Sequence, residues 1–281
     1  MKRLFKMKWI FIMALLLAVF AFPQKADAAS AITRMESGKT YSRKLDGKTH
    51  SVKYVYDGGG YSYGSKPTVK LYIDGILKKQ FRDHVYYTAW MVKASAKKTF
   101  LCIHNEGPSD DTIFFKVYEY KNGKLKAVGD LAKTARKFAD RFSYASIQKA
   151  SKNKWTVRWS LQSPAMGSMT SINVTYKVTS SGIKRLGKAY PLRTWNSYTG
   201  KHISCSNWTA RQNIAVYKAK GGSKVSYYIR KGEKVDILKM SGKNGHTWFQ
   251  VRNSKGKKGW FEDPDFGTVM NGYFEECMFA G

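Results

Sequence analysis

The chain is poor in cysteine, in proline and in acidic residues. It has 3 Cys and 6 Pro among 281 residues, and 19 Asp and Glu stand against 50 Lys and Arg. Three Cys are too few, and odd in number, for a disulfide framework, which excludes a disulfide-stabilised scaffold. Cys205 and Cys277 could still pair outside the cytoplasm. Cys102 lies in an apolar strand-like run, and we expect it to be a buried thiol.

Recognisable catalytic motifs are also absent. The chain has no H-E-x-x-H, no G-x-S-x-G, no phosphate-binding glycine loop and no C-x-x-C. Cys102 and His104 would share one face of a strand, but a nucleophilic cysteine is expected at a helix start, so a structural role is favoured. A paired-carboxylate hydrolase built on Glu106 and Asp111 has no other support. We therefore predict a protein without catalytic residues, metal or cofactor.

The first 28 residues have the three parts of a secretory signal peptide. Four basic residues precede an apolar run at 9–22, which is too short for a comfortable membrane span. Pro23 and the Ala26-Asp27-Ala28 pattern follow, and they argue against the alternative of an uncleaved anchor. We expect cleavage after Ala28, secretion to the cell exterior and no transmembrane segment in the rest of the chain.

The net charge is far above what solubility requires. It is +31 for the whole chain, and removal of residues 1–28 takes away five basic residues and one acidic residue, which leaves +27. Wall teichoic acids, anionic lipid headgroups, glycosaminoglycans and free nucleic acid are the polyanions outside a cell. The charge raises affinity for all of them and does not choose among them.

The remaining pattern predicts an all-β protein. Aromatic residues make up 15% of the chain, and β-branched and aromatic residues cluster in short runs. We predict strands at 51–56, 68–73, 85–92, 99–104, 112–120, 142–148, 155–161 and 171–178. Asp74-Gly75 and Asn122-Gly123 predict tight hairpin turns, and 131–142 predicts a short basic helix.

One hairpin pattern is repeated. Segments 68–81 and 114–129, and more loosely 172–190, combine a strand, a glycine turn and a Lys-rich strand, which favours a blade-type architecture. Together with 44–56, they resemble extracellular FG-GAP/VCBS propeller repeats. The resemblance implies a propeller-like or sandwich domain at 49–190, after a polar segment at 29–48. That family's calcium loop is reduced here to Asp46 and Gly47, so the metal is not carried over.

The C-terminal part has a tighter pattern. After a Ser/Thr/Asn-rich linker at 191–211, residues 212–267 combine a Val-Tyr strand, a Lys231-Gly232 turn, the Trp248 strand and a final glycine turn before Trp260. This set resembles bacterial SH3-like (SH3b) domains and implies a small five-stranded barrel followed by a tail at 268–281. We expect Gly232 and Gly259 to supply the backbone angles of tight turns.

By family resemblance, SH3b domains hold peptidoglycan peptides in an aromatic groove. The candidate ligand-binding residues are Tyr217, Tyr227, Tyr228, Trp248, Trp260, Lys257 and Lys258. Lys231, Lys234, Lys243 and Lys255 would complete a basic ring that attracts teichoic acid phosphate. Trp248 and Trp260 would also supply much of the barrel's buried area, and for Trp248 a core position is the favoured alternative.

The expected function is that of a secreted, non-catalytic protein that binds peptidoglycan or teichoic acid of a Gram-positive cell wall. Two alternatives remain: a secreted enzyme of unrecognised family anchored by the C-terminal domain, and an extracellular polyanion or host-matrix binder. The best nucleic-acid surface would be Lys154, Trp155, Arg158 and Trp159. Strand alternation separates its aromatic from its charged side chains, so no specific nucleic-acid binding is expected. The sequence does not indicate an oligomeric state.

Overall fold

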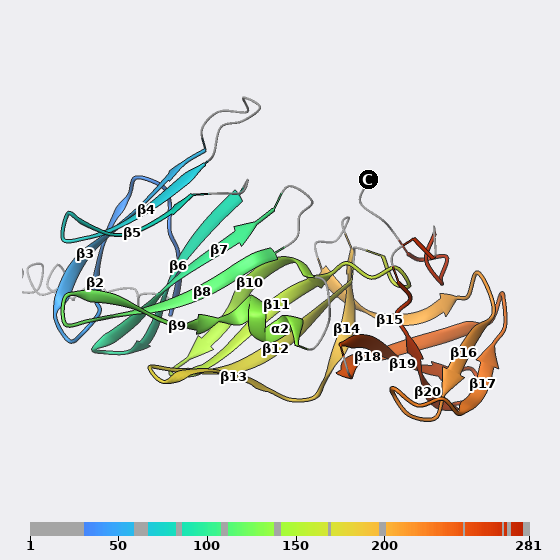
Figure 1. The fold of residues 1–281 in the computed structure, drawn as a ribbon. Helices are drawn as coiled ribbons and strands as arrows, with labels where there is room; N and C mark the ends of the chain where they lie inside the picture. The colour runs from blue at the N-terminus through green and yellow to red at the C-terminus, as the bar shows by residue number, and fades with distance from the viewer. Residues whose placement is uncertain are drawn as a thin grey trace, which may run out of the picture. The chain divides into compact units, whose positions relative to one another are not determined.

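The computed structural model describes residues 31–58, 67–82, 86–107, 112–137, 142–167, 170–196, 201–243, 245–265, 267–268 and 271–277. Within these ranges the chain forms twenty strands and one short helix (Figure 1). The all-β class is therefore confirmed. The predicted signal peptide lies outside the described residues. Among the described residues, no helix has the length and hydropathy that a membrane crossing requires.

Residues 40–186 form three successive four-stranded antiparallel meanders among the described residues. The first contains β2 (Thr40–Lys44), β3 (Thr49–Asp57), β4 (Thr68–Ile73) and β5 (Ile76–Arg82). The second contains β6 (Tyr86–Ser95), β7 (Lys98–Glu106), β8 (Thr112–Lys121) and β9 (Lys124–Asp130), with β1 (Ile32–Arg34) added beside β6. The third contains β10 (Phe142–Ser151), β11 (Lys154–Leu161), β12 (Thr170–Thr179) and β13 (Gly182–Leu186).

The repeated hairpin of the sequence forms the last two strands of each meander, β4–β5, β8–β9 and β12–β13. Asp74 and Gly75 have φ of 52° and 74°, and Asn122 and Gly123 have the same two values. These left-handed pairs are the backbone conformation of a two-residue hairpin turn that matches strand twist. All eight predicted strands are present in the structure.

The predicted helix is present in its first part, as α2 (Leu131–Arg136). Its N-cap is Asp130, whose side chain accepts hydrogen bonds from the backbone N–H groups of Ala132 (2.8 Å) and Lys133 (3.2 Å). The same carboxylate oxygen accepts from the N–H of Phe115 in β8 (3.0 Å). One side chain therefore starts the helix and joins it to the second meander.

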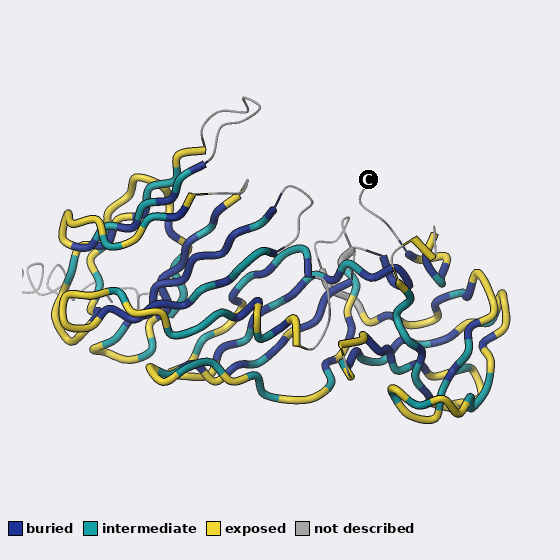
Figure 2. The backbone as a smooth tube through the Cα atoms, viewed as in Figure 1, coloured by how far each residue is buried: buried dark blue, intermediate teal, exposed yellow. Residues whose placement is uncertain are grey.

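The second meander is buried on both faces. In β7, Leu101 and Ile103 pack with the core of the first meander, whereas Phe100 and Cys102 pack with the core of the third. Because side chains alternate along a strand, a strand covered on both sides needs an almost continuous apolar run. β7 accordingly contains the uninterrupted apolar run Phe100–Ile103, and it appears dark blue along most of its length in Figure 2.

The C-terminal strands continue the sheet of the third meander. They are β14 (Ala189–Asn196), β15 (Lys201–Thr209), β16 (Ile214–Tyr217), β17 (Val225–Ile229), β18 (Lys234–Lys243), β19 (His246–Asn253) and β20 (Lys258–Glu262). Their order after β12 is β14-β15-β18-β19-β20-β16-β17. Five strands thus occupy the predicted barrel region at 212–267.

The segment expected to be a linker, 191–211, instead contains most of β14 and all of β15. Leu192, Cys205 and Trp208 are buried, and exposed serines and asparagine stand beside them. These polar residues lie on the outward side of the strands and conceal the buried positions in the sequence. The expected tail also contributes to the core, since Phe274 is fully buried against Trp208 (ring centroids 5.7 Å apart).

Candidate ligand-binding face

The five-stranded C-terminal unit has an inner apolar face and an outer face. Met240, Phe249 and Phe261 are buried on the inner face. Side chains one position away along each strand point to the other side. On that outer face, three residues on adjacent strands stand directly opposite one another: Gln250 of β19, Trp260 of β20 and Tyr217 of β16. We call this the aromatic row.

Trp248 lies two residues before Gln250 and packs against the aromatic row. Its ring meets Tyr217 edge-to-face, with centroids 5.8 Å apart and planes at 77°. Only 4% of Trp248 is exposed, whereas Tyr217 and Trp260 are half-buried. Lys220, from the connection after β16, donates to the hydroxyl of Ser241, the residue opposite Trp248 in β18. Trp248 is therefore a packing residue, and Tyr217 and Trp260 present ring surface to solvent.

Tyr227 and Lys257 lie outside the aromatic row and contact each other. The Tyr227 hydroxyl donates to the Lys257 carbonyl (3.0 Å), and the Lys257 ammonium lies 5.0 Å from the Tyr227 ring centroid. Burial raises the pKa of Tyr227 to about 12. This pair fastens the β19–β20 turn to β17, because Lys257 Nζ also donates to the Ser226 carbonyl (2.9 Å).

Tyr228 and Lys258 flank the aromatic row. Tyr228 lies opposite Ala215 in β16 and is 51% exposed, with the Arg230 guanidinium 5.8 Å from its ring centroid. Lys258 is exposed and stands opposite Arg252 of β19. The structure thus brings Tyr217, Trp248 and Trp260 together, places Tyr228 and Lys258 at the margins and gives Tyr227 and Lys257 a structural contact.

One glycine has a different role from the predicted one. Gly232 has φ of 81°, as a tight turn requires. Gly259 does not have a positive φ and lies in β20, so the turn prediction for it is wrong. A Cβ atom at Gly259 would lie 2.4 Å from Val216 Cγ1 and 2.8 Å from the Tyr217 carbonyl oxygen. The residue is glycine because β16 crosses β20 closely at this point.

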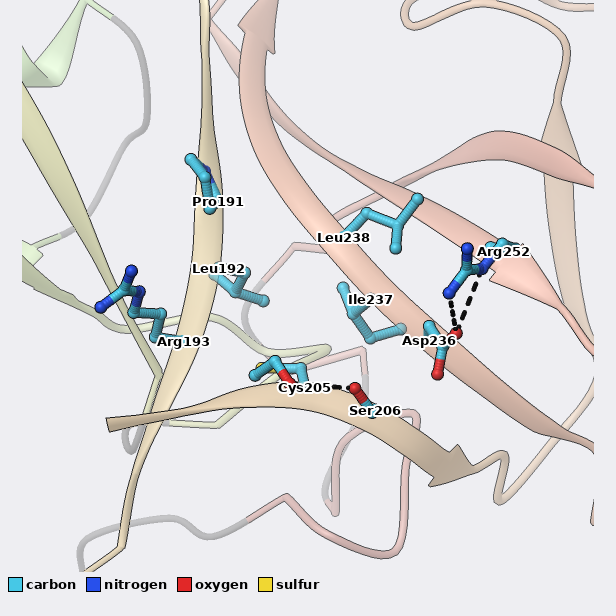
Figure 3. A pocket seen from close by; sticks show the side chains of 10 residues that line it. Pro191, Leu192, Arg193, Cys205, Ser206, Asp236, Ile237, Leu238 and Arg252 are labelled. Atoms are coloured by element: carbon cyan, nitrogen blue, oxygen red, sulfur yellow. Dashed lines mark hydrogen bonds and ion pairs between the residues drawn. The ribbon is translucent and has the colours of Figure 1, made fainter. Parts of the chain in front are cut away.

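A pocket of about 430 Å³ lies beside the aromatic row (Figure 3). β14 pairs with β18 through Ala189–Pro191 and then leaves it, while β15 joins β18 at Cys205. The divergence of these strands creates the space. Figure 3 shows Leu192 and Ile237 directed into it, and Cys205 also lines it. Each of the three is almost fully buried, so the floor is apolar.

The pocket wall is polar. Asp236 Oδ2 accepts from Arg252 Nη2 (2.7 Å) and Nε (3.2 Å), and Asp236 Oδ1 accepts from the Asn207 N–H (3.1 Å). The hydrogen bond from Arg252 holds the pKa of Asp236 below its ordinary value. Ser204 and Ser206 add two hydroxyl groups, 3.0 Å apart.

The pocket wall and the aromatic row belong to one surface. Arg252 lies two residues after Gln250 on β19, and it faces Asp236 on one side and Lys258 on the other. From β18 to β16 the surface crosses three interstrand gaps, or about 15 Å. Sequence reasoning missed the pocket because six of its ten lining residues come from the segment expected to be a linker. The alternation of apolar Leu192 with charged Arg193 was the signal available in the sequence.

The other chemical candidates are occupied or buried. Cys102 and His104 are fully buried, so the predicted burial of the Cys102 thiol is confirmed, and burial lowers the pKa of His104 to about 3. Trp155 and Trp159 are fully buried and offer no stacking surface. Asp46 accepts from His50 Nε2 (2.9 Å), so its side chain is already engaged within the protein. The described residues contain no cluster of three metal-ligating side chains.

Comparison of the chain with protein-family models, with curated proteins and with solved structures finds no match in any of the three. The resemblances to SH3b domains and to FG-GAP/VCBS repeats therefore remain predictions from the sequence motifs. The geometry of the outer face is the independent ground on which a function can be argued.

Proposed function

We propose that this chain is a secreted, non-catalytic protein that attaches to the bacterial cell wall, with the outer face of the C-terminal unit binding peptidoglycan peptide. The observation that carries the proposal is the continuity between the aromatic row and the pocket beside it. Tyr217 and Trp260 offer flat apolar surface, and the pocket offers a buried apolar floor with a charged and hydroxylated wall. Clefts that mix apolar surface with a few polar groups are typical ligand sites.

The dimensions support a short peptide. An extended peptide rises about 3.3 Å per residue, so about 15 Å of surface accommodates four or five residues. Backbone amides of such a peptide can exchange hydrogen bonds with Gln250, Arg252 and the two serine hydroxyls. The surrounding lysines supply long-range attraction to wall phosphate and raise the rate of encounter rather than the selectivity.

The test is co-sedimentation of the protein lacking residues 1–28 with purified sacculi, before and after removal of teichoic acid. We expect binding to stripped sacculi at high salt, because groove contacts persist where long-range charge attraction is screened. Trp260→Ala should weaken this binding about 10- to 30-fold, the effect of losing a central aromatic contact. Arg252→Ala, at the pocket wall, should weaken it independently of the aromatic row.

The matched control is Tyr86→Ala, which removes another aromatic side chain (Tyr86 is 42% exposed) from a different sheet. It should bind as the unmodified protein does. Circular dichroism and thermal unfolding establish that each variant is folded. Binding that disappears on stripping or in salt, with no difference between Trp260→Ala and Tyr86→Ala, would mean that charge alone attaches the protein.

A further inference from the structure

The three meanders contain six short hairpin turns, two in each, that lie at the same end of their own meander. In an antiparallel meander, every second connection returns to the same end. The connections at 45–48, 74–75, 96–97, 122–123, 152–153 and 180–181 are therefore grouped within their own meanders. We call this set the turn end.

Hydrogen bonds join the turns of different meanders. The Gly47 N–H donates to the Lys97 carbonyl (2.9 Å), which joins the first turn of meander one to the first turn of meander two. Lys78 Nζ donates to the Gly123 carbonyl (3.0 Å), which joins the second turns of the same meanders. Lys98 Nζ donates to the Ser180 hydroxyl (2.5 Å) and thereby reaches the third meander. The turn end is one continuous surface.

This surface is strongly cationic. Fourteen lysines lie in these turns or within three residues of them: Lys44, Lys48, Lys78, Lys93, Lys97, Lys98, Lys121, Lys124, Lys126, Lys149, Lys152, Lys154, Lys177 and Lys184. All except Lys78 and Lys98 are exposed, and the turns are mainly yellow in Figure 2.

The acidic residues of the turn end are engaged by partners within it. Only Asp46, Asp74 and Glu119 lie within the same three-residue limits. His50 binds both aspartates, through Nε2 to Asp46 (2.9 Å) and through Nδ1 to Asp74 (2.6 Å). Glu119 forms an ion pair with Lys98 (2.5 Å). The exposed lysines are left without an acidic counterpart among them, which makes the surface complementary to an extended anionic one.

Two aliphatic side chains project from the same end. Ile76 and Leu77 follow the β4–β5 turn directly and are 59% and 44% exposed. The position equivalent to Leu77 in the second hairpin, Leu125, is half-buried against the core of the first two meanders. Ile76 and Leu77 thus place two adjacent exposed aliphatic side chains within a lysine-rich surface.

We propose that the turn end docks onto an anionic lipid bilayer, with Ile76 and Leu77 inserted between headgroups. The lysines supply attraction to acidic headgroups, and two aliphatic side chains supply apolar area that can enter the acyl boundary. A soluble polyanion would use the lysines but would gain nothing from Ile76 and Leu77, and this favours a bilayer. The site is separate from the outer face of the C-terminal unit, so either proposal can fail alone.

The experiment measures sedimentation of the protein lacking residues 1–28 with vesicles of phosphatidylcholine containing phosphatidylglycerol. Binding should rise with the phosphatidylglycerol fraction and be weak to phosphatidylcholine alone. Ile76→Ser/Leu77→Ser should weaken vesicle binding at least fivefold and leave binding to soluble polyphosphate unchanged. Tyr228→Ser, which alters an exposed aromatic residue of the C-terminal unit, is the matched control and should bind vesicles normally.

The charge contribution is tested by Lys124→Gln/Lys126→Gln in β9. Each lysine near an acidic surface contributes about fivefold, so the pair should weaken vesicle binding about 25-fold. Lys133→Gln/Lys137→Gln makes the same charge change at α2, at the opposite end of β9. This pair should weaken vesicle binding less than threefold. Equal losses in the two lysine pairs, or vesicle binding unaffected by Ile76→Ser/Leu77→Ser, would overturn the proposal. The second result would assign the turn end to soluble polyanions.

Discussion

Substitution of Gly259 by alanine tests the close crossing of β16 and β20 on which the aromatic row depends. The added Cβ would lie 2.4 Å from Val216 Cγ1 and 2.8 Å from the Tyr217 carbonyl oxygen, both closer than real Cβ contacts. Overpacking of a well-packed site costs about 1–3 kcal/mol. Because one of the clashing atoms belongs to the backbone of β16, a rotamer change cannot relieve the contact. We therefore expect the upper end of that range, about 3 kcal/mol.

Urea unfolding followed by tryptophan fluorescence measures this loss in the free energy of unfolding, and thermal unfolding should show a fall of about 6–12 °C. The control is Gly256→Ala in the adjacent turn. Gly256 has φ of 77° and open space around its would-be Cβ, so only the left-handed conformation is penalised, by about 1 kcal/mol. Gly259→Ala should also weaken binding to sacculi while folded, because Tyr217 and Trp260 are the neighbouring pair. A loss no larger than that of Gly256→Ala would refute the crossing.

Three further predictions concern single groups. In His50, burial lowers the pKa and the hydrogen bonds to Asp74 and Asp46 raise it, with a net rise from 6.5; the bond to His50 lowers the pKa of each aspartate from 3.8. Protonated His50 contributes fully to the free energy of unfolding below about pH 6.5, and this contribution is lost as pH rises through the folded pKa of His50. The contribution of the two aspartates is lost as pH falls below about 3.8. His50→Gln should therefore lower the urea midpoint more at pH 5.5 than at pH 8.5. An equal fall in the midpoint at the two pH values would exclude a charged contact of His50 with Asp46 and Asp74. Asp130→Ala leaves three backbone N–H groups without their acceptor and should cost about 2 kcal/mol in urea unfolding, with Asp130→Asn costing less than half of that. Burial raises the pKa of Cys205 to about 12 and of Cys277 to about 11, so a thiol reagent at pH 8 should label neither cysteine until urea unfolds the chain; rapid labelling of the folded protein would contradict their burial.

The strands of the meanders could be predicted from the sequence because their signals are local. Asp74-Gly75 and Asn122-Gly123 specify hairpins through the conformation of two residues, and the runs beside them alternate or are wholly apolar. β14 and β15 could not be predicted in the same way. Their outward positions carry serine, threonine and asparagine, which are also loop residues. Their shared pairing partner β18 lies about 50 residues after β14 and about 30 residues after β15.

The candidate site was predictable in composition but not in arrangement. An aromatic face including Tyr217 and Trp260 follows from the motif, but the separation of Tyr227 from it depends on the register that pairs Tyr227 with the buried Val216 rather than with Tyr217. A shift of one position moves a side chain to the opposite face of the sheet, and no property of the residues themselves reveals it. The pocket depends on the point where β14 leaves β18, which is a property of three strands and of no single motif.

The distribution of charge shows how topology adds information that composition lacks. Along the sequence the lysines are spread over the whole chain, and the net charge of +31 indicates only that an anionic partner is favoured. Each hairpin turn is polar for local reasons, since turn residues face water and flanking lysines keep it soluble. A meander then returns every second turn to the same end, and bonds such as Gly47 to Lys97 join the ends of neighbouring meanders. Repetition of one hairpin therefore converts a dispersed charge into a single cationic surface, and the exposed pair Ile76 and Leu77 is the feature on which the proposal of a lipid surface, rather than a soluble polyanion, depends.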